Sequence, residues 1–190
     1  MLRFLWLFAL LLATLSHSTE ARAADGAAQQ QRARRFVDHG MGTTLAACNL
    51  PRTCGHRAPV HATKQLRETG NDARIDQRHV TFDGLDVEFL YVLGWYGAPA
   101  ISRAQAYRLP YVLELTVTSS AWPVAQGLRV GTKRADVHKV LGDNGATPSH
   151  DGSPEPDCDS YVNVETQNEA RLCYDRGRLA SIKWVMWWDG

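Results

Sequence analysis

The amino-acid sequence predicts an α+β domain, in which a mostly antiparallel β-sheet carries one or two short helices packed on one face. Several segments alternate apolar and polar residues with a period of two, turn residues separate these segments, and one short segment has a helical period. The composition, 44% hydrophobic and 22% charged, fits one ordinary globular domain. It excludes collagen-like, coiled-coil and wholly disordered chains.

Residues 1–23 have the three parts of a secretory signal peptide. Arg3 supplies a positive start, residues 4–15 form an apolar run, and an Ala-x-Ala cleavage motif ends at Ala23. The run is shorter than the roughly 20 residues that a membrane-spanning helix needs. We therefore expect export to the periplasm, a mature chain that begins at Ala24, and no transmembrane segment in that mature chain.

Export places the four cysteines in an oxidising compartment, where an even number favours disulfides. Three pairings are possible. We favour Cys48–Cys54 with Cys158–Cys173, because each of these pairs brackets a local turn-rich segment.

Residues 24–58 are polar and rich in arginine, which predicts a flexible lead followed by a disulfide-tied loop. The single α+β domain is expected over residues 59–190. Its first predicted element is a short helix over residues 63–69, closed by Gly70.

A β-hairpin is predicted around Asp83-Gly84, which stands between two apolar segments. The strand after it alternates cleanly and places Asp86 and Glu88 on its polar face. Residues 111–118 form the next predicted strand. The residues expected together on the apolar faces of these two strands are Leu85, Val87, Phe89, Tyr91 and Leu93, and Tyr111, Leu113, Leu115 and Val117.

The helical period occurs in residues 132–142. Thr132 is the predicted N-cap, Val137 and Leu141 lie on the apolar stripe, and Gly142 ends the helix. His138 lies off this stripe and is expected at the surface. An acidic loop that includes Asp159 follows, and the chain closes with three strands.

The final hairpin, residues 172–185, resembles the hairpin of residues 80–92. Each has an apolar residue, an aromatic residue, an aspartate, a turn with glycine and then an alternating strand. Two interpretations stay open. Either the fold is a tandem helix–hairpin repeat, or two hairpins resemble each other by chance.

No nucleophile elbow, phosphate-binding loop or metalloprotease motif occurs in the chain. The formal charge of +1 gives no electrostatic case for nucleic acid. Asp86 and Glu88 lie about 7 Å apart by strand rise, which suits the carboxylate pair of a small hydrolase. The same pattern is typical of a solvated sheet face, so we predict no catalytic residue.

His56 and His61 follow the first two cysteines and raise the alternative of a metal or small-ligand module. The cysteine spacing is longer than that of usual zinc sites. We expect no metal and no cofactor.

Aromatic residues are the remaining candidates for function. Trp95 and Tyr96 fall at a glycine-flanked loop tip, and Trp187 falls on the polar face of the last strand. Exposed aromatic side chains are common in protein-binding hot spots. These three residues are our predicted binding site.

Residues 128–144 (LRVGTKRADVHKVLGDN) and the strands up to residue 187 resemble the SmpA/OmlA (BamE-like) family of outer-membrane assembly lipoproteins. The shared features are the Gly-Thr helix start, the inward Val137 and the terminal Leu-Gly. The resemblance implies a non-enzymatic domain that holds another protein. A tandem version of the unit is the fold of the β-lactamase inhibitor proteins. The family's acylated cysteine has no counterpart near Ala24, so we expect no lipid anchor.

The sequence therefore predicts a periplasmic, non-enzymatic domain that binds another envelope or exported protein. Its role would be in envelope assembly, or as an inhibitor or immunity-type partner of an exported enzyme. The alternatives are the small hydrolase and the metal or ligand module described above.

Overall fold

The structure is a computed structural model of the chain. It describes residues 25–46, 48–49, 53–54, 57–69, 73–95, 102–106, 110–143 and 157–187. Several sequence predictions lie outside these residues: the signal peptide over residues 1–23, Tyr96 and His56.

The described residues form a seven-stranded antiparallel sheet with the strand order β3-β4-β5-β6-β9-β8-β7, and helices beside it. This confirms the predicted α+β class. The strands of this sheet are β3 (His61–Thr69), β4 (Ala73–Phe82), β5 (Leu85–Trp95), β6 (Tyr111–Val117), β7 (Cys158–Asn163), β8 (Asn168–Asp175) and β9 (Arg178–Val185). The other elements are an N-terminal helix over residues 25–45, β1 (Cys48–Asn49), β2 (Thr53–Cys54), α2 (Arg103–Ala106), the 3-10 turn η1 (Ala125–Gly127) and α3 (Arg134–Leu141).

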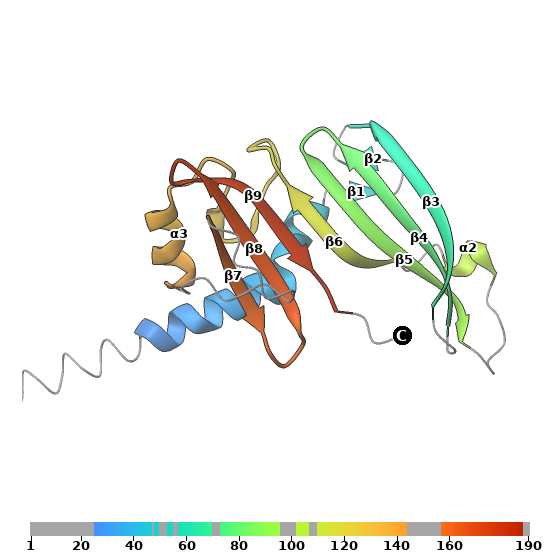
Figure 1. Cartoon of the computed structure of the whole chain (residues 1–190), viewed down its shortest axis with the longest axis horizontal. Coiled ribbons are helices and arrows are strands. Elements are labelled where there is room, and N and C mark those ends of the chain that lie inside the picture. The colour runs from blue at the N-terminus through green and yellow to red at the C-terminus, as the bar shows by residue number, and fades with distance from the viewer. Residues whose placement is uncertain are drawn as a thin grey trace, which may run out of the picture.

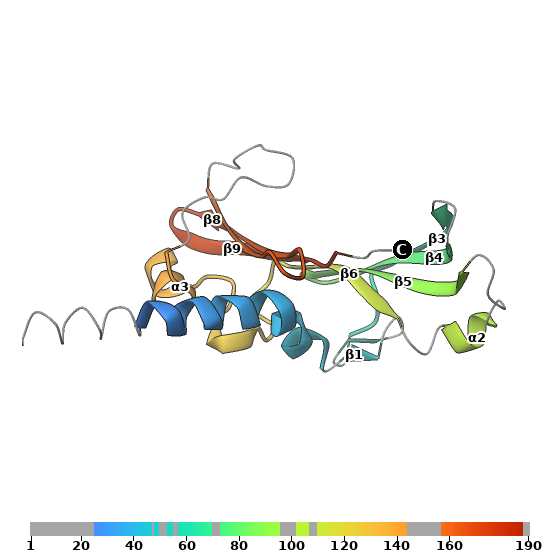
Figure 2. The ribbon, with the colours of Figure 1, turned by 90° about the horizontal axis from the view of Figure 1, so that it is seen from below.

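The molecule has two layers. Figure 1 shows the sheet across the molecule, and Figure 2 shows the N-terminal helix, α3 and α2 together on one side of it. We call the side that carries the helices the covered face and the other side the open face. The N-terminal helix and α3 both lie under the half of the sheet made by β7, β8 and β9 (Figure 1).

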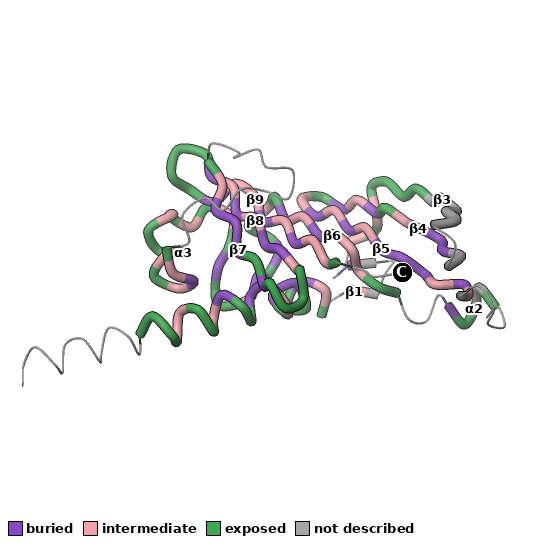
Figure 3. Tube along the Cα trace, turned by 60° about the horizontal axis from the view of Figure 1, so that its bottom comes forward, coloured by how far each residue is buried: buried purple, intermediate pink, exposed green. Residues whose placement is uncertain are grey.

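Alternation along the strands builds the covered face from apolar rows that cross the sheet, and Figure 3 shows this alternation of burial along the trace. The rows are paired by strand register and are almost wholly buried. One row is Val80, Val87, Leu115, Trp184, Ala170 and Tyr161, and the next is Phe82, Leu85, Val117, Ile182, Leu172 and Asp159.

The predicted flexible lead is wrong for residues 25–45, which form the N-terminal helix. Its inner side buries a stripe at helical spacing. The buried residues of this stripe are Ala33, Phe36, Val37, Gly40, Met41 and Thr44. Small and weakly apolar residues make up half of this stripe, so a search for strongly apolar side chains passes over it.

The predicted helix over residues 63–69 is also wrong, since these residues belong to β3. They pair with β4 from His61 opposite Thr81 to Thr69 opposite Ala73. Local helix propensity is a weak preference, and pairing along a neighbouring strand overrides it here.

Both predicted hairpins are present. β4 and β5 turn at Gly84, β8 and β9 turn at Gly177, and both glycines have positive φ. In chain order, a helix precedes β3–β5, and α3 precedes β7–β9. The similarity therefore extends beyond the two hairpins. The fold has two units, each made of one helix and three strands, and β6 joins them.

Two local predictions differ in detail. α3 has Lys133 rather than Thr132 at its N-cap, and the Thr132 hydroxyl accepts the N–H of Arg129 instead. A bulge in the pairing of β5 with β6 shifts the register after Glu88. As a result, Tyr111 is exposed and Leu113 lies away from the main core.

The predicted disulfide pairing is confirmed. Cys48–Cys54 joins the two short strands β1 and β2, and Cys158–Cys173 joins β7 to β8. Among the described residues, no helix is long and apolar enough to cross a membrane.

Candidate functional site

The open face carries two polar rows that cross six strands. Both rows come from residues that alternate with the buried apolar rows of the covered face. The first row is Thr81, Asp86, Thr116, Lys183, Arg171 and Ser160, and the second is His79, Glu88, Glu114, Val185, Glu169 and Val162.

Hydrogen bonds and ion pairs hold the side chains of these rows. The Thr81 hydroxyl donates to Asp86 at 2.6 Å, and His79 Nε2 lies 3.4 Å from the same carboxylate oxygen. Lys183 Nζ lies 2.9 Å from Glu114 Oε1. The open face is therefore partly exposed, and ion pairs hold its positive and negative side chains in place.

Near β7 the same face contains a buried carboxylate. Glu169 is 3% exposed, accepts the Ser160 hydroxyl at 2.5 Å and lies 3.3 Å from Arg171 Nε. A buried carboxylate without donors would be strongly destabilising, so these two donors fix the side chain in one position.

Apolar and aromatic residues gather at one end of the open face. Ile75 and Leu90 are buried there, with Val92 and Leu113 packed beside them. Tyr111 is 54% exposed and Trp187 is 53% exposed. The register places both residues at this end, because Val185 pairs with Glu114 and Met186 N–H donates to the carbonyl of Leu113.

The backbone holds Trp187 in place, since its N–H donates to the side-chain oxygen of Asn168 at 3.1 Å. Of the three predicted binding residues, Trp187 is the one whose side chain is described. Trp95 ends β5, and its side chain is outside the description, as is all of Tyr96.

Strand register also separates Trp95 from Trp187. Glu88 and Val185 both pair with Glu114, so Trp95 lies about five residues, or roughly 16 Å, further along the strand direction than Trp187. These two tryptophans therefore do not form one compact patch. Tyr111, which sequence reasoning placed in the core, is the aromatic residue at the same end as Trp187.

The carboxylates of the hydrolase alternative lie on the open face, as predicted. Asp86 is bound to Thr81 and His79, and Glu88 lies level with Glu114 on the neighbouring strand. Neither Asp86 nor Glu88 lines the two cavities described in this structure. The pair forms part of a partly exposed polar surface rather than the wall of a substrate pocket.

On the covered face, Asp159 anchors α3 to the sheet. The predicted loop position of Asp159 is wrong, since Asp159 lies in β7, and His138, expected at the surface, is one quarter exposed. Asp159 is 1% exposed, accepts a hydrogen bond from Arg134 and lies 2.7 Å from His138 Nε2. Burial raises the pKa of Asp159, but the hydrogen bonds with Arg134 and His138 outweigh burial and hold the pKa below its ordinary value.

A second carboxylate anchors the N-terminal helix. Asp38 accepts hydrogen bonds from Asn163 at 2.7 Å, Thr166 at 2.8 Å and Asn168 at 3.0 Å, which lie at the end of β7, in the turn and at the start of β8. Asp159 and Asp38 each hold a helix against the sheet. This structural role explains both carboxylates, so neither is assigned to a reactive centre.

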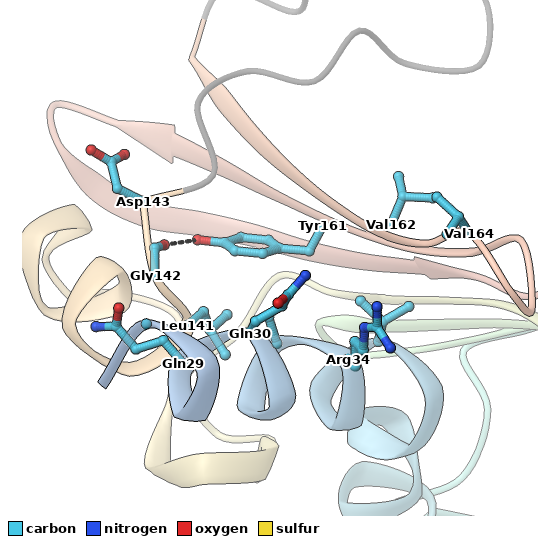
Figure 4. Close-up of a pocket in the computed structure, with 12 residues that line it drawn as sticks. Gln29, Gln30, Arg34, Leu141, Gly142, Asp143, Tyr161, Val162 and Val164 are labelled. Carbon is cyan, nitrogen blue, oxygen red and sulfur yellow. Dashed lines mark hydrogen bonds between the residues drawn. The ribbon is translucent and has the colours of Figure 1, made fainter. Parts of the chain in front are cut away.

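A cavity of about 390 Å³ lies between the N-terminal helix, the end of α3 and β7 (Figure 4). The ring of Tyr161 extends across it, and the Tyr161 hydroxyl donates to the carbonyl of Gly142 at 2.9 Å. Gln29, Gln30 and Arg34 line it from the N-terminal helix. Sequence reasoning missed this cavity because it depends on a helix that was not predicted.

His61 begins β3 and is exposed, and no group of three or more His, Cys, Asp or Glu side chains within the described residues could hold a metal ion. Comparison with protein-family models, with curated proteins and with solved structures finds no match to this chain.

Proposed function

We propose that this protein is an exported, non-enzymatic domain that binds another envelope or exported protein through the open face of its sheet. The observation that carries the proposal is the asymmetry of the sheet. Helices cover one face, while the other presents ordered ion pairs beside two aromatic side chains that are more than half exposed. Exposed aromatic anchors beside a polar, solvent-accessible rim are typical of protein interfaces.

Export is supported by the leader-like pattern of residues 1–23 and by two disulfides, which are typical of oxidising compartments. The resemblance to outer-membrane assembly lipoproteins points to the same compartment and to a role in holding a protein. Two units of one helix and three strands also agree with a tandem arrangement. The proposed compartment is therefore the periplasm.

The test compares two lysines that make similar ion pairs on opposite sides of the molecule. Lys183 pairs with Glu114 at 2.9 Å on the open face, and Lys139 pairs with Asp136 at 2.8 Å on α3. Wild-type chain, Lys183→Ala and Lys139→Ala are used as baits against an envelope extract, and captured proteins are quantified by mass spectrometry.

The proposal predicts a stoichiometric protein partner on the wild-type and Lys139→Ala baits and at least a several-fold loss on Lys183→Ala. Equal capture by all three baits would place binding elsewhere on the molecule. An empty wild-type bait, shown to be folded and oxidised, would count against protein binding and favour the hydrolase alternative.

A separate variant tests the hydrolase alternative. Glu88→Gln keeps the shape of the side chain on the open face but removes its charge. If the chain hydrolyses a glycosidic or similar bond through Asp86 and Glu88, this variant loses that activity while its fold is retained.

A further inference from the structure

Two polar side chains border the apolar end of the open face. Leu90 lies at the centre of this end and is buried there. Strand register places Gln77 of β4 on one side of Leu90 and Tyr111 of β6 on the other. Glu88 precedes Leu90 by two residues on β5, so it faces the same way and is the diagonal neighbour of both Gln77 and Tyr111. Glu88, Gln77 and Tyr111 therefore surround one position on the open face.

Glu88 is a carboxylate without a cation. Strand pairing places it opposite Glu114 on β6 and opposite His79 on β4. Lys183 Nζ lies 2.9 Å from Glu114, and His79 Nε2 lies 3.4 Å from Asp86. Within the described residues, no hydrogen bond or ion pair involves the Glu88 side chain. Like charges directly opposite each other destabilise a sheet, so a cation brought to Glu88 by another molecule would be favourable.

Gln77 supplies a second unused acceptor beside the apolar end. Its side-chain oxygen Oε1 is buried and accepts no hydrogen bond from the part of the chain that the structure describes. A buried acceptor without a donor costs free energy, which is recovered when a donor binds to it. The residue as a whole is half-buried, so rotation about its side-chain bonds brings this oxygen to the surface. A partner that fits Glu88 and Gln77 together must therefore bring N–H donors.

Arginine matches this position better than lysine does. Its guanidinium carries five N–H donors in a flat fork and no acceptor, so a single side chain can donate to a carboxylate and to a second oxygen. The flat group also stacks on aromatic rings, and Tyr111 is 54% exposed beside Leu90. Val92 and Leu113 are only partly buried, so they leave apolar surface for a side chain next to that arginine.

We propose that the open face selects a partner protein that presents an arginine next to an apolar side chain. The guanidinium binds Glu88 and Gln77 and stacks on Tyr111. The apolar side chain packs against Val92 and Leu113. This partner chemistry rests on the proposed role of the open face in protein binding, and it adds the kind of side chain that the face recognises.

The experiment compares two peptides, each mixed with the purified oxidised chain. One is the acetylated and amidated tripeptide Leu-Arg-Leu, and in the other citrulline replaces the arginine, which keeps the shape of the side chain but removes its charge. Backbone amide shifts measured by NMR give the affinity and the place of binding. We expect the arginine peptide to bind at least fivefold more tightly than the citrulline peptide, with shifts at Gln77, Glu88 and Tyr111.

Two variants separate binding from folding. Glu88→Gln removes the charge, and Gln77→Leu removes the unused acceptor. Each should weaken binding of the arginine peptide at least threefold without lowering the midpoint of urea unfolding, because neither group has a partner in the free chain. Glu165→Gln is the matched control, since Glu165 is an exposed glutamate in the turn between β7 and β8, and it should bind the peptide as the wild type does.

Equal affinity for the two peptides, binding of neither at millimolar concentration, or undiminished binding to Glu88→Gln would overturn the proposal. A loss of stability in both Glu88→Gln and Gln77→Leu would also overturn it, because both side chains would then support the fold. The capture experiment distinguishes this proposal from the proposed function. Charge-dependent peptide binding by a chain that captures no envelope protein would support the arginine site and count against the proposed function. A captured partner that binds Glu88→Gln as tightly as the wild type would retain protein binding and overturn the arginine site.

Discussion

Trp184 donates its indole N–H to the backbone carbonyl of Phe36 at 3.0 Å, across 148 residues of sequence. The two aromatic rings also pack with their centroids 5.2 Å apart. This contact joins the last strand to the N-terminal helix at the centre of the covered face. The helix is thus part of the core rather than an appendage, and the open face is left as the exposed side of the sheet.

Trp184→Phe should destabilise the chain by about 3 kcal/mol, because it removes a buried hydrogen bond and leaves a cavity. Trp187→Phe, at an exposed position, should change stability by less than about 1 kcal/mol. Urea unfolding of both variants measures the difference. Similar midpoints would show that the N-terminal helix does not contribute to the folded core.

The buried carboxylate of Asp159 should make stability depend on pH in the acidic range. Its pKa is lowered in the folded state, so its contribution is complete above the unfolded value near pH 4 and is lost as the pH falls below it. Unfolding free energies of the wild type and Asp159→Asn should therefore differ most above pH 5 and converge toward pH 2. A difference that grows on acidification would contradict this assignment.

The two hairpin glycines should respond differently to alanine. Both have positive φ, +74° at Gly84 and +71° at Gly177. A Cβ on Gly84 would overlap the Cβ of Ser119, whereas a Cβ on Gly177 would meet no atom within 4 Å. Gly177→Ala should cost about 1 kcal/mol from backbone strain alone, and Gly84→Ala clearly more. Equal thermal midpoints would mean that the β4–β5 turn relaxes to accept the side chain.

The Cys158–Cys173 disulfide should contribute about 3 kcal/mol, since it closes a loop across a sequence separation of 15 residues. The double variant Cys158→Ser/Cys173→Ser tests this by urea unfolding in oxidising buffer. A reductant opens both disulfides of the wild type. The difference in unfolding free energy between the reduced wild type and the oxidised double variant therefore gives the contribution of Cys48–Cys54. A loss below about 1 kcal/mol would show that the β7–β8 ladder needs no covalent support.

Strand alternation was readable from the sequence because it is strictly local. Leu85, Val87, Phe89, Tyr91 and Leu93 are all buried, as their spacing predicts, and Asp83-Gly84 marks the turn, so this hairpin was predicted correctly. The face of the sheet on which each of residues 111–113 lies could not be predicted. A bulge depends on the pairing of β6 with β5 and not on the sequence of β6 alone.

The parts of the candidate site that sequence reasoning missed depend on contacts between distant segments. In the sequence, Asp159 belongs to a predicted acidic loop. Only the fold brings Arg134 and His138 of α3 beside it. The cavity between the N-terminal helix, the end of α3 and β7 likewise requires Gln30 and Arg34. They belong to the N-terminal helix, whose buried stripe includes Gly40 and Thr44. Long-range partners of this kind leave no periodic signal in the chain.

The most direct test of the proposed function measures the affinity of the captured partner for the wild type, Tyr111→Ala/Trp187→Ala and Lys139→Ala. We predict that the double variant binds at least tenfold more weakly, because it removes both exposed aromatic side chains from one end of the open face, while Lys139→Ala binds as the wild type does. Circular dichroism confirms that each variant is folded. Unchanged affinity in the folded double variant would contradict binding through the open face.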